Sequence, residues 1–132
     1  MKVTAFLSFF VVFIAASCEE SGDSIVGSSK DTEISNMSFT LDTTYISNTS
    51  LVAQGKAIYN GRDRVSPPWY VEAQFYTDST FVTKLGGNHT AISVPLDPGQ
   101  QTFWLISFSS AQVDVRQFPR FRVKDIRAIY KN

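Results

Sequence analysis

Beyond residue 33 the chain is a succession of short runs rich in β-branched and aromatic residues, and this pattern limits the fold more than any other feature. Between the runs lie turn signals built from Gly, Pro, Asn, Asp and Ser, with Asp97-Pro98-Gly99 the strongest and Gly86-Gly87-Asn88 another. No segment of helical periodicity separates the runs, so they predict an all-β fold, a seven-stranded antiparallel β-sandwich. The predicted strands are residues 34–46, 51–60, 69–77, 80–85, 90–96, 101–109 and 120–131.

Alternation within the runs predicts which side chains face the core, because successive residues of a strand point to opposite faces. A Trp that opens a central strand of a sandwich is well suited to fill the core, and Trp69 opens the third run. The inward positions predicted in this way are Trp69, Val71, Ala73 and Phe75 in the third run, and Ile92, Val94 and Leu96 in the fifth.

Two runs depart from simple alternation. The last run changes phase between Val123 and Ile126, which predicts a β-bulge near Lys124-Asp125. The sixth run is apolar on both faces, so we expect it either to be central and covered outside or to expose an apolar patch. Its two faces are Phe103 with Leu105, and Trp104 with Ile106 and Phe108.

Residues 1–17 have the pattern of a secretory signal peptide. Lys2 supplies a positive start, and the apolar run over residues 5–16 is too short to span a bilayer. The small residues Ala15-Ala16-Ser17 lead directly into Cys18, the only cysteine of the chain. This arrangement resembles a bacterial lipobox, so Cys18 is predicted to be acylated and to begin the mature protein. The alternative is that Cys18 is an ordinary residue of a cleaved signal.

Composition divides the rest of the chain into two parts. Residues 18–33 are polar and Gly/Ser-rich, with five acidic residues against one Lys, which predicts a flexible tether. Residues 34–132 form the predicted domain, and they hold ten basic residues against seven acidic ones. This surplus of three is too small for a nucleic-acid-binding face. Because one cysteine permits no internal disulfide, the domain must be stabilised by its core.

The inventory of catalytic residues is thin. His89 is the only histidine, and in a Gly-Gly-Asn-His-Thr segment it is expected to be a solvated turn residue rather than a general base. With one histidine and one cysteine there is no thiol–histidine pair and no Cys/His metal set, so no metal, cofactor or catalytic residue is predicted. A carboxylate-based hydrolase remains an alternative if several acidic residues converge in the fold: Asp63, Glu72, Asp78 and Asp114.

The last run is also the most basic. Arg120, Arg122 and Lys124 alternate and therefore share a face, and Arg127 rejoins that face after the predicted bulge. One interpretation is a docking face for an acidic partner or an anionic glycan. The other is an edge strand that is protected from aggregation by its charges.

Several segments together resemble one family. Val71-Glu-Ala-Gln-Phe-Tyr-Thr-Asp78, Phe81-Val82, Val94-Pro-Leu-Asp-Pro-Gly99 and Phe103 resemble the FxLYD-type domains, with Phe75-Tyr76-Thr77-Asp78 in place of the Leu-Tyr-Asp triplet. The stretch from Gly55 to Asn60 resembles that family's Gly-x-Val-x-Asn strand, with the asparagine one position late. The resemblance covers about residues 34–130. It implies an immunoglobulin-like sandwich in a bacterial envelope protein, often a lipoprotein, and transfers no catalytic residue.

Together these features predict a membrane-anchored, extracytoplasmic lipoprotein of the bacterial cell envelope, at the outer membrane or cell surface, with a non-catalytic binding or scaffolding domain. Its expected partners are the membrane, through the N-terminal acyl chains, and an envelope protein or a glycan, but not nucleic acid. The alternative from another class is a secreted eukaryotic recognition domain, since Asn36, Asn48 and Asn88 each begin an Asn-x-Ser/Thr sequence.

Overall fold

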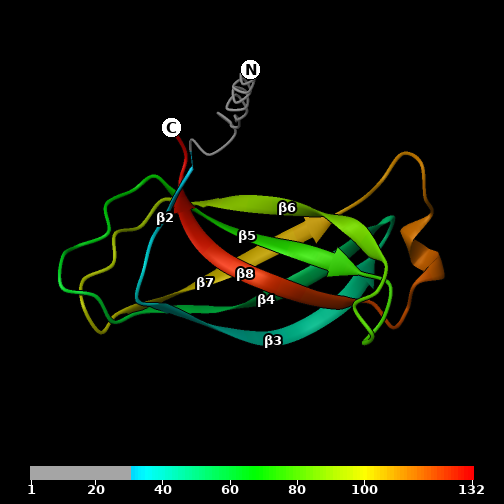
Figure 1. The fold of residues 1–132 in the computed structure, drawn as a ribbon, viewed down its shortest axis with the longest axis horizontal. Helices are drawn as coiled ribbons and strands as arrows, with labels where there is room; N and C mark the ends of the chain where they lie inside the picture. The colour runs from blue at the N-terminus through cyan, green and yellow to red at the C-terminus, as the bar shows by residue number, and fades with distance from the viewer. Residues whose placement is uncertain (1–30) are drawn as a thin grey trace, which may run out of the picture. The chain divides into compact units, whose positions relative to one another are not determined.

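Two antiparallel β-sheets packed face to face make up residues 31–132, the part of the chain that the computed structural model describes (Figure 1). The prediction of an all-β, seven-stranded antiparallel sandwich is confirmed. The predicted signal peptide, Cys18 and most of the predicted tether lie outside the described residues. The four-stranded sheet has the order β2-β8-β5-β6 and the three-stranded sheet the order β3-β4-β7. The strands are β2 Thr32–Glu33, β3 Met37–Ser47, β4 Ser50–Tyr59, β5 Trp69–Tyr76, β6 Lys84–Ile92, β7 Gln101–Phe108 and β8 Arg122–Tyr130, with a short 3-10 helix η3 at Val115–Gln117.

The strand order follows the immunoglobulin pattern. The sheet β3-β4-β7 has the connectivity of strands A, B and E, and β5 lies beside β8 as strand C lies beside strand F. β6 pairs with β5 in the place that strand C′ takes in variable-type domains, whereas β2 comes from the start of the domain and takes the edge beside β8 that strand G takes in an antibody domain. Trp69 opens β5 and is fully buried, which is the position and environment of the core Trp on strand C.

The inward face of β5 is as the alternation predicts. Trp69, Val71, Ala73 and Phe75 are all fully buried. The Trp69 indole N–H donates to the Val94 carbonyl at 2.9 Å, so the one polar atom of this side chain is satisfied. A buried aromatic side chain of this size contributes about 3–5 kcal/mol relative to Ala.

The fourth and fifth predicted strands are wrong in their bounds. They form one strand, β6, which runs through the predicted turn at Gly86-Gly87-Asn88 and pairs with β5 along its length. The two glycines allow close packing rather than a turn. A Cβ on Gly86 would lie 2.6 Å from Cε1 of Phe108, and one on Gly87 would lie 2.4 Å from Oε1 of Gln74. Glycine in a strand can mark such close contact as well as a reversal of the chain.

Two further predictions have clear outcomes. Val94 is 43 % exposed, so its predicted burial is wrong; β6 ends at Ile92, and the alternation does not extend into the loop that follows. The bulge in the last strand is confirmed. The register with β5 shifts by one residue between Lys124 and Arg127, and Asp125 there has a φ of 56°.

The sixth predicted strand, β7, is an edge strand rather than a central one. Among residues 31–132 it is hydrogen-bonded to β4 on one side, and no strand pairs with its other side. Trp104 and Ile106 are buried under the sheet, while Phe103 is 72 % exposed and Leu105 46 % exposed on the outer face. Of the two alternatives for this run, the exposed apolar patch is the one observed.

Candidate functional site

The loops of the sandwich gather at its two opposite ends, which the register of β5 defines (Figure 1). Residues 60–68 and 93–100 lie at the end where β5 begins, and we call this the closed end. Residues 77–83 and 109–121 lie at the end where β5 stops, and we call this the open end.

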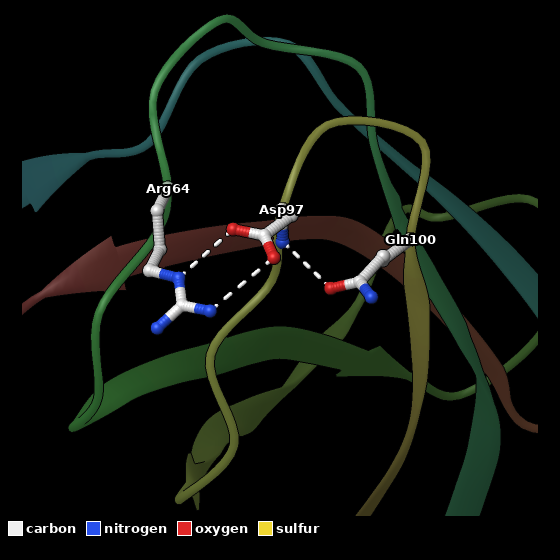
Figure 2. Close-up of polar contacts among 3 residues, drawn as sticks. All are labelled: Arg64, Asp97 and Gln100. Atoms are coloured by element: carbon white, nitrogen blue, oxygen red, sulfur yellow. Dashed lines mark hydrogen bonds and ion pairs between the residues drawn. The ribbon is translucent and has the colours of Figure 1, made fainter.

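Side chains tie the two loops of the closed end together. The Arg64 guanidinium binds both carboxylate oxygens of Asp97, with Nε to Oδ1 at 2.8 Å and Nη2 to Oδ2 at 3.3 Å, and Oε1 of Gln100 accepts from the backbone N–H of Asp97 at 2.8 Å (Figure 2). Val65 and Leu96 exchange two backbone hydrogen bonds beneath these groups. The hydrogen bonds from Arg64, followed by its charge, lower the pKa of Asp97. The polar side chains of the closed end are therefore bound to one another and hold the two loops together.

The open end holds a hollow of about 650 Å³, which is within the usual range for ligand sites. Its apolar wall consists of Leu85, Val113, Phe118 and Pro119, and its charged groups are Asp78, Lys84 and Arg120. Its residues come from the segment between β5 and β6, from the start of β6 and from the loop that connects β7 with β8. Apolar walls combined with a few charged groups are typical of sites that take a small molecule or a side chain of a partner.

The charged groups in the hollow differ in whether they have hydrogen-bond partners. The Asp78 carboxylate accepts hydrogen bonds from the backbone N–H and the hydroxyl of Thr80, at 2.9 and 2.5 Å. These bonds, together with the charge of Arg122, lower the pKa of Asp78 and keep it ionised. Among residues 31–132, neither Lys84 nor Arg120 has an ion-pair or hydrogen-bond partner for its charged group. The hollow therefore offers two unpaired cations beside an apolar wall.

Packing holds the groups around the hollow in place. Arg120 lies between the turn at Phe118 and the buried Phe121, whose N–H donates to the Phe118 carbonyl at 3.1 Å. The Phe121 ring stacks on Phe75 in the core at 6.0 Å between centroids. The preceding helix η3 is capped by Asp114, which accepts from the backbone N–H and the guanidinium of Arg116. The backbone that carries Arg120 is thus held by hydrogen bonds and by packing of its neighbours in the core.

The predicted basic face is divided between two surfaces. Arg122, Lys124 and Arg127 pair with Tyr76, Gln74 and Glu72, so these three basic residues lie on the outer face of the four-stranded sheet, as the alternation predicts. Arg120 precedes β8 and lines the hollow instead.

The three basic residues on the sheet already have partners within the domain. Arg127 is ion-paired with Glu72 and, at 3.6 Å, with Glu33. The ammonium of Lys124 lies 4.9 Å from the Phe81 ring centroid, and the Arg122 guanidinium donates to two backbone carbonyls. The docking role of this face stays a prediction.

His89 lies in β6 rather than in a turn, because the predicted turn does not exist. It is opposite Glu72 in the ladder, and its ring makes an edge contact with Tyr70 at 5.5 Å between centroids. The four carboxylates considered for a hydrolase occupy separate places, in the loop before β5, on β5, in the loop after it and at the cap of η3: Asp63, Glu72, Asp78 and Asp114. Within residues 31–132 there is no group of three or more His, Cys, Asp or Glu residues that could hold a metal ion.

Of the residues around the hollow, sequence reasoning singled out Arg120, in the basic face, and Asp78, among the candidate carboxylates, and it missed the others. Lys84 begins β6, and Val113 and Phe118 belong to the long loop between β7 and β8. These residues are far apart in sequence, and their meeting depends on how the two loops fold over the end of the core. No local pattern marks such a site.

Comparison of the chain with protein-family models, with curated proteins and with solved structures gives no match. In the part of the chain that the structure covers, no helix is long and apolar enough to cross a membrane.

Proposed function

We propose that this protein is a lipid-anchored, extracytoplasmic binding module of the bacterial cell envelope, with no catalytic role, and that its open end binds an anionic ligand with an apolar part. The observation that carries the proposal is the hollow of about 650 Å³ beside whose apolar wall Lys84 and Arg120 have no charged or hydrogen-bonding partner within residues 31–132. The first half of the proposal rests on the signal pattern that ends at Cys18, and on the resemblance to envelope domains.

The chemistry of the hollow favours an anion. A cation near an apolar surface gains most from a ligand that brings an opposite charge, and a carboxylate or phosphate accepts charge-assisted hydrogen bonds from both Lys and Arg. The apolar wall adds affinity for a ligand that carries an aliphatic or aromatic portion next to its charge. Asp78 stays ionised and offsets one of the two cations, so the charged groups of the hollow, Lys84 and Arg120 against Asp78, leave a net charge of one positive.

The position of the anchor is compatible with this site. Thr32 pairs with Tyr130 at the closed end, so the chain enters the sandwich at the end opposite the hollow. Residues 18–31 reach at most roughly 50 Å when fully extended. An anchor at Cys18 would therefore join the domain through the strand β2 at its closed end, and not through the loops around the hollow. Two or three acyl chains, rather than one, are needed for a stable anchor.

The two alternatives have less support. A carboxylate hydrolase requires acidic residues that converge, and of the four candidates only Asp78 and Asp114 lie at the same end of the sandwich. Of the three Asn-x-Ser/Thr sites that a glycosylated secreted domain would offer, the one at Asn88 does not present its side-chain nitrogen freely to solvent. That nitrogen donates to the Ser107 carbonyl at 2.7 Å.

The ligand site can be tested with anilinonaphthalene sulfonate, a fluorescent probe that combines one negative charge with aromatic rings. We expect saturable binding to the mature chain carrying Cys18→Ser, weakened about tenfold by Lys84→Gln and by Arg120→Gln, in line with one charge-assisted hydrogen bond lost. Arg62→Gln, which removes an exposed cation at the closed end, is the matched control. Equal affinity of all four proteins would contradict the site.

The anchor is tested separately by mass spectrometry of the mature N-terminus. We expect a diacyl- or triacylglyceryl group on Cys18, and release of the domain from membranes or a block in processing for Cys18→Ser. An unmodified N-terminus at Glu19 would exclude the anchor while leaving the ligand site open to its own test.

A further inference from the structure

Strand β7 forms an edge that lacks the usual protection. Exposed edges in natural sheets are commonly blocked by charged residues, prolines, bulges or very short strands. Three of the four edges in residues 31–132 follow this rule: β2 has two residues, β3 carries Asp42 and a bulge, and β6 carries Lys84. From Gln101 to Phe108, β7 has neither a charged residue nor a proline.

One hydrogen bond shows which backbone groups of β7 face outward. The side-chain amide of Asn88 donates to the Ser107 carbonyl at 2.7 Å, so Ser107 directs its carbonyl away from β4 and toward β6. Along a strand, alternate residues direct their N–H and C=O groups to the same side. The residues that share this side are therefore Gln101, Phe103 and Leu105, and within residues 31–132 these outward groups have no hydrogen-bond partner.

The side chains next to this edge are also open. Phe103 and Leu105 are exposed on the outer face of the three-stranded sheet. The nearest charges lie further in, with Lys56 on β4 and Asp42 on β3. These two form an ion pair at 3.4 Å, and the Lys56 ammonium lies 5.8 Å from the Phe103 ring centroid. These two charges balance one another. The uncharged edge of β7 therefore lies next to an apolar surface, formed by Phe103 and Leu105, whose neighbouring charges cancel.

We infer that β7 pairs with β7 of a second copy of this chain, antiparallel and about a two-fold axis at Phe103. Asn88 and Ser107 close one end of the edge, and the Phe108 ring packs against Gly86 there, so Gln101 to Leu105 is the free stretch. Its centre is Phe103. In this register Phe103 faces Phe103 of the second copy, and Gln101 faces Leu105, so every outward backbone group of the three residues gains a partner.

A second copy suits this surface better than an unrelated strand because the edge is complementary to itself. An isologous contact presents the same patch twice, so no like charges meet across an uncharged strand. The pairing joins two three-stranded sheets into one of six strands and uses up the unprotected edge, which ends assembly at the dimer. An interface of about one strand from each copy is small, so the dimer is expected to be weak in solution.

Cysteine substitution tests both the contact and its register. Opposed residues of a hydrogen-bonded antiparallel pair have Cα atoms about 5.5 Å apart, which suits a disulfide. Leu105 and its copy are offset by four residues, roughly 14 Å apart. With the full chain we expect oxidative dimers for Phe103→Cys and, for Leu105→Cys, only the background of the unsubstituted chain, which carries Cys18 alone. Equal crosslinking of both variants, or none for Phe103→Cys, would overturn the inference.

Sedimentation of the full chain in detergent gives an independent measurement. Phe103→Lys places two like charges on the axis, so the concentration-dependent dimer should become a monomer with an unchanged melting temperature. Val82→Lys, at a side chain that is 82 % exposed in the loop after β5, should leave the dimer intact. A dimer that persists in Phe103→Lys, an unsubstituted chain that is monomeric at all concentrations, or open-ended growth would each contradict the proposal.

Discussion

The two ends of the sandwich use the same kinds of residue in opposite ways. At the closed end, Arg64 and Asp97 bind one another across two loops, and Gln100 adds a third polar contact (Figure 2). At the open end, Asp78 is hydrogen-bonded within its own turn, and the cations Lys84 and Arg120 line a hollow without a partner in the described part of the chain. A loop cation stabilises the fold when a carboxylate from another loop is within reach. Without one it is available to a ligand.

A substitution in the shared core should affect both ends at once and have the largest effect. We expect Trp69→Ala to lower the free energy of unfolding by about 3–5 kcal/mol, since it empties a fully buried position and removes the hydrogen bond to Val94. Urea denaturation measures this loss. Ser38→Ala, at an exposed position of β3, is the control. Similar denaturation midpoints for the two variants would show that β5 is not the common support of both ends.

A substitution close to the hollow should act on the open end alone. In Gly86→Ala the new methyl group would meet the Phe108 ring, so we expect a loss of about 1–3 kcal/mol together with displacement of the neighbouring Lys84 and Leu85. Backbone amide shifts should change near the hollow and not around Arg64. An unchanged stability would mean that Phe108 moves aside without cost, and shifts at both ends would contradict their independence.

The ion pair of the closed end should give the smallest effect, visible as a dependence on pH. Because Arg64 lowers the pKa of Asp97 in the folded protein, the pair contributes stability above the ordinary aspartate pKa of 3.8 and loses that contribution as the pH falls through the lowered value. The urea midpoint of the unsubstituted chain should therefore fall more steeply below pH 3.8 than that of Asp97→Asn. Parallel curves would show that the exposed pair is energetically silent, as many are.

Much more of the fold than of the candidate site could be predicted from the sequence. Alternation identified the buried face of β5 and the bulge at Asp125, because both depend on local spacing. Local sequence patterns gave the wrong result at Gly86-Gly87-Asn88. The two glycines are needed there because Phe108 and Gln74, which lie on other strands, approach their backbone closely.

The hollow could not be predicted from local sequence patterns for the same reason. Lys84 and Arg120 are brought together only by the folding of two distant loops over the core. Exposed cations of the last strand looked alike in sequence. In the structure, Arg127 has carboxylate partners on neighbouring strands and Lys124 contacts Phe81 in a loop, whereas the Arg120 guanidinium has no partner among residues 31–132.

The most direct test of the functional difference between the two ends is to map the binding of anilinonaphthalene sulfonate by amide chemical shifts on the isotope-labelled mature chain carrying Cys18→Ser. We predict shift changes that concentrate at the open end, at residues 77–85 and 113–120, and that reach saturation at the same probe concentration. Residues 60–68 and 93–100 at the closed end should not respond. Changes centred on Phe103 and Leu105, or on the loops that carry Arg64 and Asp97, would contradict it.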